Sequence, residues 1–156
     1  MRCELLGDKH PDVAISLGIL ANCYGNLGNY SRDLELGQQA LEMRCELLGD
    51  KHPDVAISLG NLANCYSSLG NYSRALELGK QALEMRHELL GDKHPHVALS
   101  LGILANCYSR LGNYSRALEL GQQALEMRRE LLGDKHPHVA SSLGNLARCY
   151  SDIGNH

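Results

Sequence analysis

Apolar residues recur along the chain at the spacing of an α-helix, and short polar segments interrupt them at regular intervals. Between Pro53 and Leu69 the apolar positions lie three or four residues apart, as expected for a helix with one buried stripe. Gly70 and Asn71 then mark a turn, and a second stripe follows up to Leu90. The same pattern along the whole chain predicts seven helices and no strands. The predicted helices span residues 11–27, 30–48, 53–69, 72–90, 95–111, 114–132 and 137–153.

The sequence repeats itself every 42 residues. Complete units cover residues 1–42, 43–84 and 85–126, and a partial unit covers residues 127–156. Units one and two differ at 5 of their 42 positions (Ile19, Gly25, Asn26, Asp33 and Gln38 in unit one), so we expect all units to fold alike. Repeats of this length are typical of solenoids, in which no unit buries its apolar face alone. We therefore expect a single all-α, right-handed α-solenoid of stacked helix-turn-helix repeats over residues 1–156, with Met1–Leu6 as the tail of a further helix.

Eight positions of the repeat carry a resemblance to a known family. In unit two they are Leu62, Ala63, Tyr66, Gly70, Tyr72, Ala75, Ala82 and Leu83. This pattern resembles the tetratricopeptide repeat (TPR) family, and the longer unit with its LGDKHPDVA segment resembles the kinesin light chain type. The resemblance implies that the first helix of each unit lines a concave groove that binds proteins or peptides. Asp33 departs from the pattern, and the lysine of the family's carboxylate clamp is replaced by glycine in each complete unit (Gly18, Gly60, Gly102).

Positions that differ between units identify a candidate peptide-binding face. On the first helices they fall 4, 3 and 4 residues apart, which places them on one narrow face opposite the apolar stripe. The candidates are Ile15, Ile19, Asn22, Ile57, Asn61, Asn64, Ser68, Leu99, Ile103, Asn106 and Arg110. Exposed apolar side chains often mark contact sites, and asparagines can hydrogen-bond an extended peptide backbone. Two alternatives stay open: the positions are merely exposed, or the isoleucines and the leucine fill gaps between neighbouring first helices.

Charge and the chemistry-bearing residues narrow the possible functions. The net charge is −3, which argues against nucleic acid or an anionic membrane as the main partner. The six cysteines and most of the eight histidines are periodic copies rather than metal motifs, so we expect no metal, no cofactor and a reducing, cytoplasmic location. A catalytic site would recur in several near-identical copies, so the repetition argues against an enzyme. The expected partner is a protein or peptide.

The last predicted helix keeps an apolar stripe that a second helix covers in the earlier units. Its members are Leu143, Leu146, Ala147 and Tyr150. Burial of apolar surface is favourable, so we expect copies of the chain to associate at this end, by stacking or by helix swapping, as a homo-oligomer. A structural array that assembles end to end is therefore the alternative function.

Glycines and histidines at fixed positions of the repeat give two smaller predictions. Gly79 lies on the apolar stripe and is expected to admit another helix, whereas Gly60 either serves packing or leaves room for a ligand. His96 and His138 stand at helix starts where earlier units have aspartate, and a protonated imidazole there opposes the helix dipole. Stability should therefore fall as pH drops through about 6.5.

Overall fold

The computed structural model describes residues 10–154, and every regular element in that range is a helix. The helices are α2 (Pro11–Asn26), α3 (Tyr30–Leu48), α4 (Pro53–Ser68), α5 (Tyr72–Leu90), α6 (Pro95–Arg110), α7 (Tyr114–Leu132) and α8 (Pro137–Gly154). All seven predicted helices are confirmed, and their ends agree with the prediction to within one residue. The expected helix tail at Met1–Leu6 lies outside the described residues.

A histidine followed by proline starts each first helix. Proline fits the first helical position because its missing N–H has no partner there. The histidine caps the helix: Nδ1 of His52 accepts a hydrogen bond from the backbone N–H of Asp54 at 3.1 Å, and His10, His94 and His136 do the same. These four histidines therefore serve the helix starts. Among the described residues no group of three or more metal-binding side chains comes together.

A glycine followed by asparagine joins the two helices of each hairpin. Gly70 has a φ of +85°, a conformation that glycine adopts without steric cost. The side-chain oxygen of Asn71 then accepts a hydrogen bond from the backbone N–H of Arg74 at 3.2 Å and caps α5. Because the same pair recurs before α3 and α7, the chain reverses at the same place in each hairpin.

Helices of successive units approach each other closely at glycine. A Cβ atom at Gly79 would lie 3.0 Å from Cδ2 of Leu104, and Gly37 faces Leu62 in the same way. This geometry confirms that Gly79 admits a neighbouring helix. A Cβ atom at Gly60 would lie 3.4 Å from Nη2 of Arg86, an ordinary contact with the end of a flexible side chain, so close packing does not account for this glycine.

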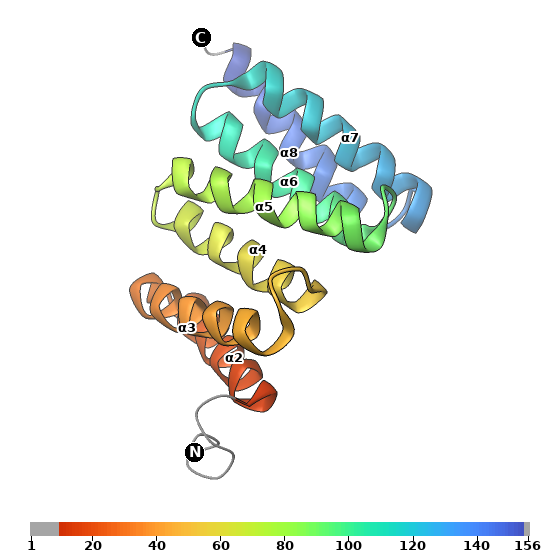
Figure 1. Ribbon diagram of the computed structural model, residues 1–156. Coiled ribbons are helices and arrows are strands. Elements are labelled where there is room, and N and C mark those ends of the chain that lie inside the picture. Colours follow the sequence, from red (N-terminus) through yellow and green to blue (C-terminus); the bar gives the residue numbers. More distant parts are fainter. Residues whose placement is uncertain (1–9, 155–156) are drawn as a thin grey trace.

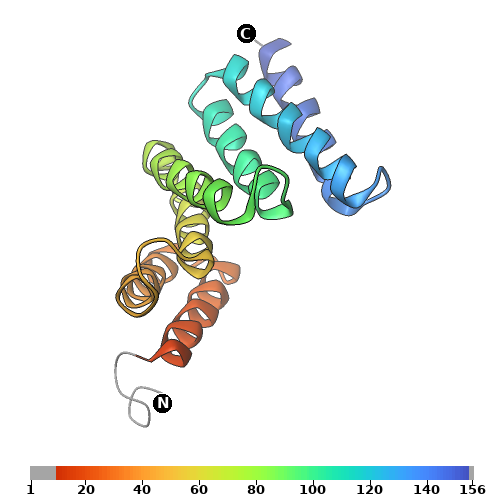
Figure 2. The same ribbon diagram turned by 45° about the vertical axis from the view of Figure 1, so that its right-hand side comes forward.

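The hairpins follow one another in a stacked array whose two ends carry the two chain termini (Figure 1). Each helix contacts the next one along the chain, and the first helices α4, α6 and α8 also contact one another in sequence. The turned view shows the paired helices of a hairpin running side by side (Figure 2). The array is therefore an α-solenoid, in which α2, α4, α6 and α8 are the first helices and α3, α5 and α7 the second.

Candidate functional site

Most of the variable face of the first helices is accessible. The side chains of Ile15, Ile19 and Leu99 are 48%, 59% and 41% exposed, although they are large and apolar. Ile57 is half-buried. The polar candidates Asn22, Asn61, Asn64, Ser68 and Arg110 are exposed. A partner that reaches the first helices would therefore meet both apolar and hydrogen-bonding groups.

A cleft between α2 and α4 brings several of these side chains together. Its volume is about 270 Å³. The polar residues that line it are Asn22, Asn26, Tyr30, Asp33, Asn61, Asn64 and Ser68. Four of them, Asn22, Asn61, Asn64 and Ser68, are predicted binding residues. Tyr30 was not predicted because it lies on a second helix. The amides supply donors and acceptors of the kind that an extended peptide backbone requires.

Asp33 contributes a carboxylate to this cleft. Partial burial raises the pKa of Asp33 above its ordinary value, and a hydrogen bond with Cys65 opposes that shift. Burial, together with this nearby carboxylate, raises the pKa of Cys65 to about 12. The Cys65 sulfur also lies 3.2 Å from the carbonyl oxygen of Tyr30, so its single proton has two acceptors within reach. Cys65 therefore remains a protonated donor rather than a nucleophile.

Ile103 is not part of the accessible face, which corrects the sequence prediction. Its side chain is only 8% exposed and belongs to an apolar cluster with Leu62 and Ala63 of α4 and Leu78 of α5. Its Cγ2 atom lies 3.7 Å from the place of a Cβ at Gly79. At this position the alternative that an isoleucine fills a gap between neighbouring helices is the correct one.

Asn106 differs from the other asparagines at its repeat position because it is engaged within the chain. Its Nδ2 donates to Oγ of Ser67 at 3.4 Å, and its Oδ1 accepts from Nη2 of Arg148 at 3.4 Å. Asn22 and Asn64 are exposed. Of the three equivalent asparagines, Asn22 and Asn64 are therefore exposed, whereas Asn106 is hydrogen-bonded to other side chains.

An arginine from each second helix ties the next first helix in place, a contact that the sequence analysis missed. Nη1 of Arg86 donates to Oγ of Ser100 at 2.7 Å and to the carbonyl oxygen of His96 at 3.2 Å. Arg44 with Ser58 and Arg128 with Ser142 form the same 2.7 Å bond. Burial lowers the pKa of Arg86 and of Arg128. The signal in the sequence is that arginine and serine recur at a fixed separation of 14 residues.

The end of the array is less open than predicted. Leu146 is 9% exposed and packs with Leu125 and Val139, so it faces α7 and is not part of an open end. Leu143 and Tyr150 are 45% and 54% exposed, and Ala147 is exposed as well. The correction arises because a first helix has two apolar sides, one toward the preceding second helix and one toward the following one.

A second cleft, of about 420 Å³, lies between α3 and α5. Val55 and Leu59 of α4 contribute apolar surface to it. Lys51 and Glu88, which also line the cleft, form an ion pair of 3.4 Å. This hollow was not predicted because the site was inferred from varying positions of the first helices alone. Cys45, which lines it on α3, stands at a position that also varies between units.

Comparisons with known proteins agree with this architecture. A sequence model of the tetratricopeptide repeat matches residues 34–87, 80–130 and 116–156, and a second model of the same repeat matches residues 13–54. The fold places the chain among α-solenoid repeat proteins. Within that class, the chain belongs to the tetratricopeptide repeat family. No curated protein matches its sequence.

Similar solved structures are kinesin light chain-like repeat proteins. One is a kinesin light chain from Podosopora anserina with nearly identical TPR-like repeats, at 28% identity and a TM-score of 0.79, with 99% of this chain and 74% of that chain covered. A variant of that protein with a single substitution matches at 28% identity and a TM-score of 0.81, over 99% and 73% of the two chains. BtubC (BKLC) from P. vanneervenii matches at 26% identity and a TM-score of 0.83, over 93% of this chain and 58% of BtubC.

These relatives place the chain in a general functional class. Proteins built from tetratricopeptide repeats generally act as non-catalytic scaffolds that bind other proteins. In the part of the chain that the structure describes, we find no helix with the length and hydropathy needed to span a bilayer.

Proposed function

We propose that this chain is a scaffold that binds an extended segment of a protein partner along its first helices. The observation that carries the proposal is the cleft between α2 and α4, where Asn22, Asn61 and Asn64 line one hollow. Exposed Ile15 and Ile19 lie on α2, at positions of the same variable face. A segment with apolar side chains and a free backbone matches this combination, because it buries the isoleucines and bonds to the amides.

A peptide selection tests this proposal. Peptides selected from a random display library on the wild-type chain should lose affinity when Asn22→Ala and Asn64→Ala are combined. We expect about a tenfold loss, since two amide hydrogen bonds of about 0.5–1.5 kcal/mol each disappear. Gln39→Ala, on an exposed position of α3, serves as the control and should bind like wild type. Equal affinity for the double variant and the control would contradict groove binding.

We propose self-association as a second function of the same array. It is supported by Leu143 of α8, which is 45% exposed, whereas Leu101 at the same repeat position is 4% exposed and packs with Leu120 of α7. Tyr150 adds to this uncovered stripe. A second copy of the chain carries helices of the repeat sequence that covers the equivalent stripe of α6, either by stacking or by exchanging a helix.

Sedimentation velocity over a wide concentration range tests self-association. The wild-type chain should form dimers or larger species as concentration rises, and Leu143→Gln combined with Tyr150→Gln should stay monomeric. Leu99→Gln removes an equally exposed leucine from the binding face and should leave association unchanged. A wild-type chain that sediments as a monomer at every concentration would rule the second function out.

A further inference from the structure

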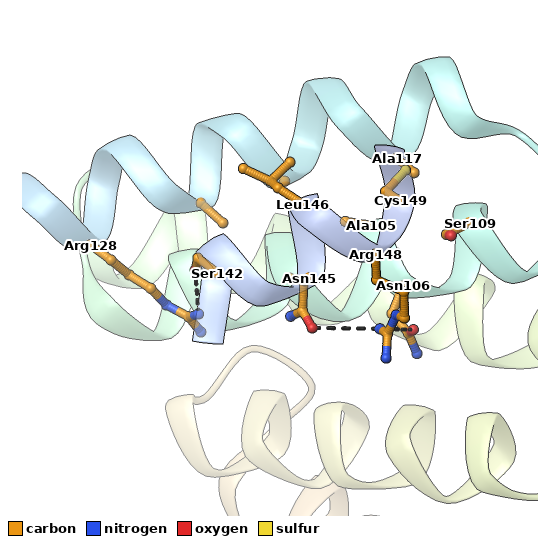
Figure 3. A pocket seen from close by; sticks show the side chains of 13 residues that line it. Ala105, Asn106, Ser109, Ala117, Arg128, Ser142, Asn145, Leu146, Arg148 and Cys149 are labelled. Carbon is orange, nitrogen blue, oxygen red and sulfur yellow. Dashed lines mark hydrogen bonds between the residues drawn. The ribbon is translucent and has the colours of Figure 1, made fainter. Parts of the chain in front are cut away.

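Hollows between the helices differ in size and in what surrounds them. The crevice lined by α6, α7 and α8 offers only about 30 Å³, and several of its polar side chains bond to one another (Figure 3). Arg128 donates to Ser142 at 2.7 Å there, and Arg148 donates to Asn145 at 3.5 Å. The cleft between α3 and α5 offers about 420 Å³, a volume typical of sites that take a ligand. The cleft is therefore the better place for side chains of a partner to enter.

The cleft between α3 and α5 combines an apolar floor with a polar rim. The floor is buried or half-buried and consists of Leu41, Cys45, Val55, Leu59 and Met85. The rim is exposed and consists of Asp50, Lys51, Gln81, Glu84 and Glu88. Burial, and after it the charges of Asp50 and Glu42, raise the pKa of Cys45, so its thiol stays protonated and adds uncharged surface to the floor. A partner that fits this cleft therefore brings an apolar group.

Two carboxylates of the rim have no cationic partner in the described part of the chain. Nζ of Lys51 lies 3.4 Å from Oε2 of Glu88, so these two charges balance each other. Asp50 and Glu84 form no ion pair with any of residues 10–154. The rim therefore keeps two negative charges and favours a partner that brings a cation.

The later units show which side chains the aspartate of the rim accepts. The position of Cys45 holds His87 in the next unit and Arg129 in the unit after it. Nδ1 of His87 lies 3.2 Å from Oδ1 of Asp92, and Nε of Arg129 lies 3.8 Å from Oδ1 of Asp134. Both aspartates are equivalents of the rim aspartate. Two units thus supply their own nitrogen-bearing side chain to this carboxylate, whereas Cys45 supplies none.

The same exchange of residues accompanies a change in the space available. One unit after the cleft, the equivalent hollow measures about 200 Å³ and is lined by Lys93, Gln123, Glu126, Met127 and Glu130. The apolar residues that correspond to Leu41, Val55 and Leu59 do not line it. This difference is expected when the larger side chain of His87 takes the place of Cys45.

We propose that the cleft between α3 and α5 is a separate binding site for an arginine and an adjacent apolar side chain of a protein partner. The guanidinium group bonds to Asp50 or Glu84 and takes the role that Arg129 has toward Asp134. The apolar side chain lies on the floor, where its burial supplies most of the affinity, and the charges supply the selectivity.

This site is independent of the proposed groove binding. The cleft between α3 and α5 shares no lining residue with the cleft between α2 and α4. Both contain residues of α4, but Leu59 belongs to its apolar stripe, whereas Asn61 and Asn64 lie on the opposite, variable face. A scaffold with both sites holds two segments at once, one on each side of α4.

Titrations of the full chain with capped peptides, followed by nuclear magnetic resonance, test the proposal. The probe is a tripeptide of leucine, alanine and arginine, in which glutamine replaces arginine for an uncharged control and glutamate for an anionic one. Signals of Cys45, Leu59 and Met85 should shift with the arginine peptide. It should bind about three- to fivefold more tightly than the glutamine peptide, as expected for an exposed ion pair, and the glutamate peptide should bind most weakly.

The chain's own repeats supply the first variant. Cys45→Arg installs the residue found at Arg129, which fills the cleft and pairs with Asp50. Binding of the arginine peptide should fall by about tenfold, as expected when one apolar side chain is no longer buried. Asp50→Asn combined with Glu84→Gln keeps the space but removes both charges, so the arginine and glutamine peptides should then bind equally.

Four results would overturn the proposal: no shift in the cleft with the arginine peptide, equal binding of the arginine and glutamine peptides to wild type, unchanged binding in Cys45→Arg, or cleft signals that move with protein concentration alone. The second would indicate a purely apolar site for a small molecule, and the last a second copy of the chain as the occupant. Asn22→Ala combined with Asn64→Ala should bind the arginine peptide like wild type, so failure of the proposed groove binding is read separately.

Discussion

The buried contact between Arg86 and Ser100 gives a sharp test of what holds consecutive units together. Replacing Ser100 with alanine removes the hydroxyl that accepts from Nη1 of Arg86 at 2.7 Å. Arg86 is 4% exposed, and its Nε is already buried without a hydrogen-bond partner. Water therefore cannot easily replace the lost acceptor, and the guanidinium keeps only the carbonyl oxygen of His96.

The expected magnitude follows from two opposing terms. A hydrogen bond to a charged group is worth about 1.5–3 kcal/mol, and alanine is preferred over serine in a helix by roughly 0.5 kcal/mol. Ser100→Ala should therefore lower the free energy of unfolding by about 1–2.5 kcal/mol. Arg44 makes the same bond to Ser58 but is only half-buried, so water can reach its guanidinium even though Ser58 itself is buried. Ser58→Ala should consequently change the stability by less than about 0.5 kcal/mol.

Urea denaturation followed by far-ultraviolet circular dichroism measures both variants. Ser142→Ala should resemble Ser100→Ala, because Arg128 is 8% exposed. The two buried junctions and the half-buried one thus form an internal series with the same bond length. Equal losses in Ser58→Ala and Ser100→Ala, or no loss in Ser100→Ala, would refute the argument that burial sets the strength of this contact.

Three further predictions concern glycine, histidine and cysteine. Gly144→Ala should stabilise the chain by up to about 1 kcal/mol, since a Cβ there meets nothing within 4 Å. Gly121→Ala should gain less or lose stability, since its Cβ would lie 2.9 Å from Cδ2 of Leu146. Thermal denaturation of the two variants compares these effects. Burial, and after it Arg86 and His94, lower the pKa of His96 below 6.5, so the unfolded chain binds more protons and stability should fall as pH drops below 6.5 and through the lower folded pKa. His96→Asp should diminish that fall, and an unchanged pH profile in urea denaturation would contradict it. On a Cys3→Ser background, iodoacetamide should label exposed Cys23 well before Cys65 and Cys107, whose pKa values are raised to about 12 and about 11, as peptide mass spectrometry can show; uniform labelling would count against this order.

The helix boundaries were predictable because proline and glycine constrain the backbone locally. Proline at Pro53 and glycine at Gly70 restrict the backbone of their own and adjacent residues, whatever the rest of the fold does. Helical spacing between them then identifies which side is apolar. The ends of all seven helices therefore follow from the sequence alone, as does the close contact at Gly79. The direction of the pKa shift at His96 agrees with the prediction, but its causes are burial, then Arg86 and His94, and not the helix dipole from which it was predicted.

The burial of individual face residues was not predictable because it depends on neighbouring helices. Ile19 and Ile103 are the same residue at the same repeat position, yet they are 59% and 8% exposed. Ile103 packs against α4 and α5, whereas Ile19 lies on the first described helix, with no preceding hairpin among the described residues. A helical wheel assigns both to one face and cannot distinguish them.

The contacts between helices that recur unchanged in every unit were also not predictable from the varying positions. Arg86 and Ser100 recur in other units, so they are not among the varying positions from which the site was predicted. Their separation of 14 residues crosses the turn between α5 and α6, so helical periodicity does not relate them. Only the stacking of a second helix on the next first helix brings them together. The constant residues thus form the junction, and the varying residues change what the junction exposes.

Because the residues that join the units are constant and only their neighbours vary, one repeat can offer different sites without changing its architecture. The bond between arginine and serine is 2.7 Å at all three junctions, although the neighbouring position holds Asn61, Ile103 or Asn145. The residue at this neighbouring position therefore does not disturb the contact that orders the units. Asn61 and Asn145 each line a small crevice between helices, whereas Ile103 packs into an apolar cluster, so a single substitution at this position can close or open a crevice while the array keeps its stacking. Because the charge of each crevice depends on other varying positions, such as Asp33 and Arg148, size and charge can be set independently at each junction.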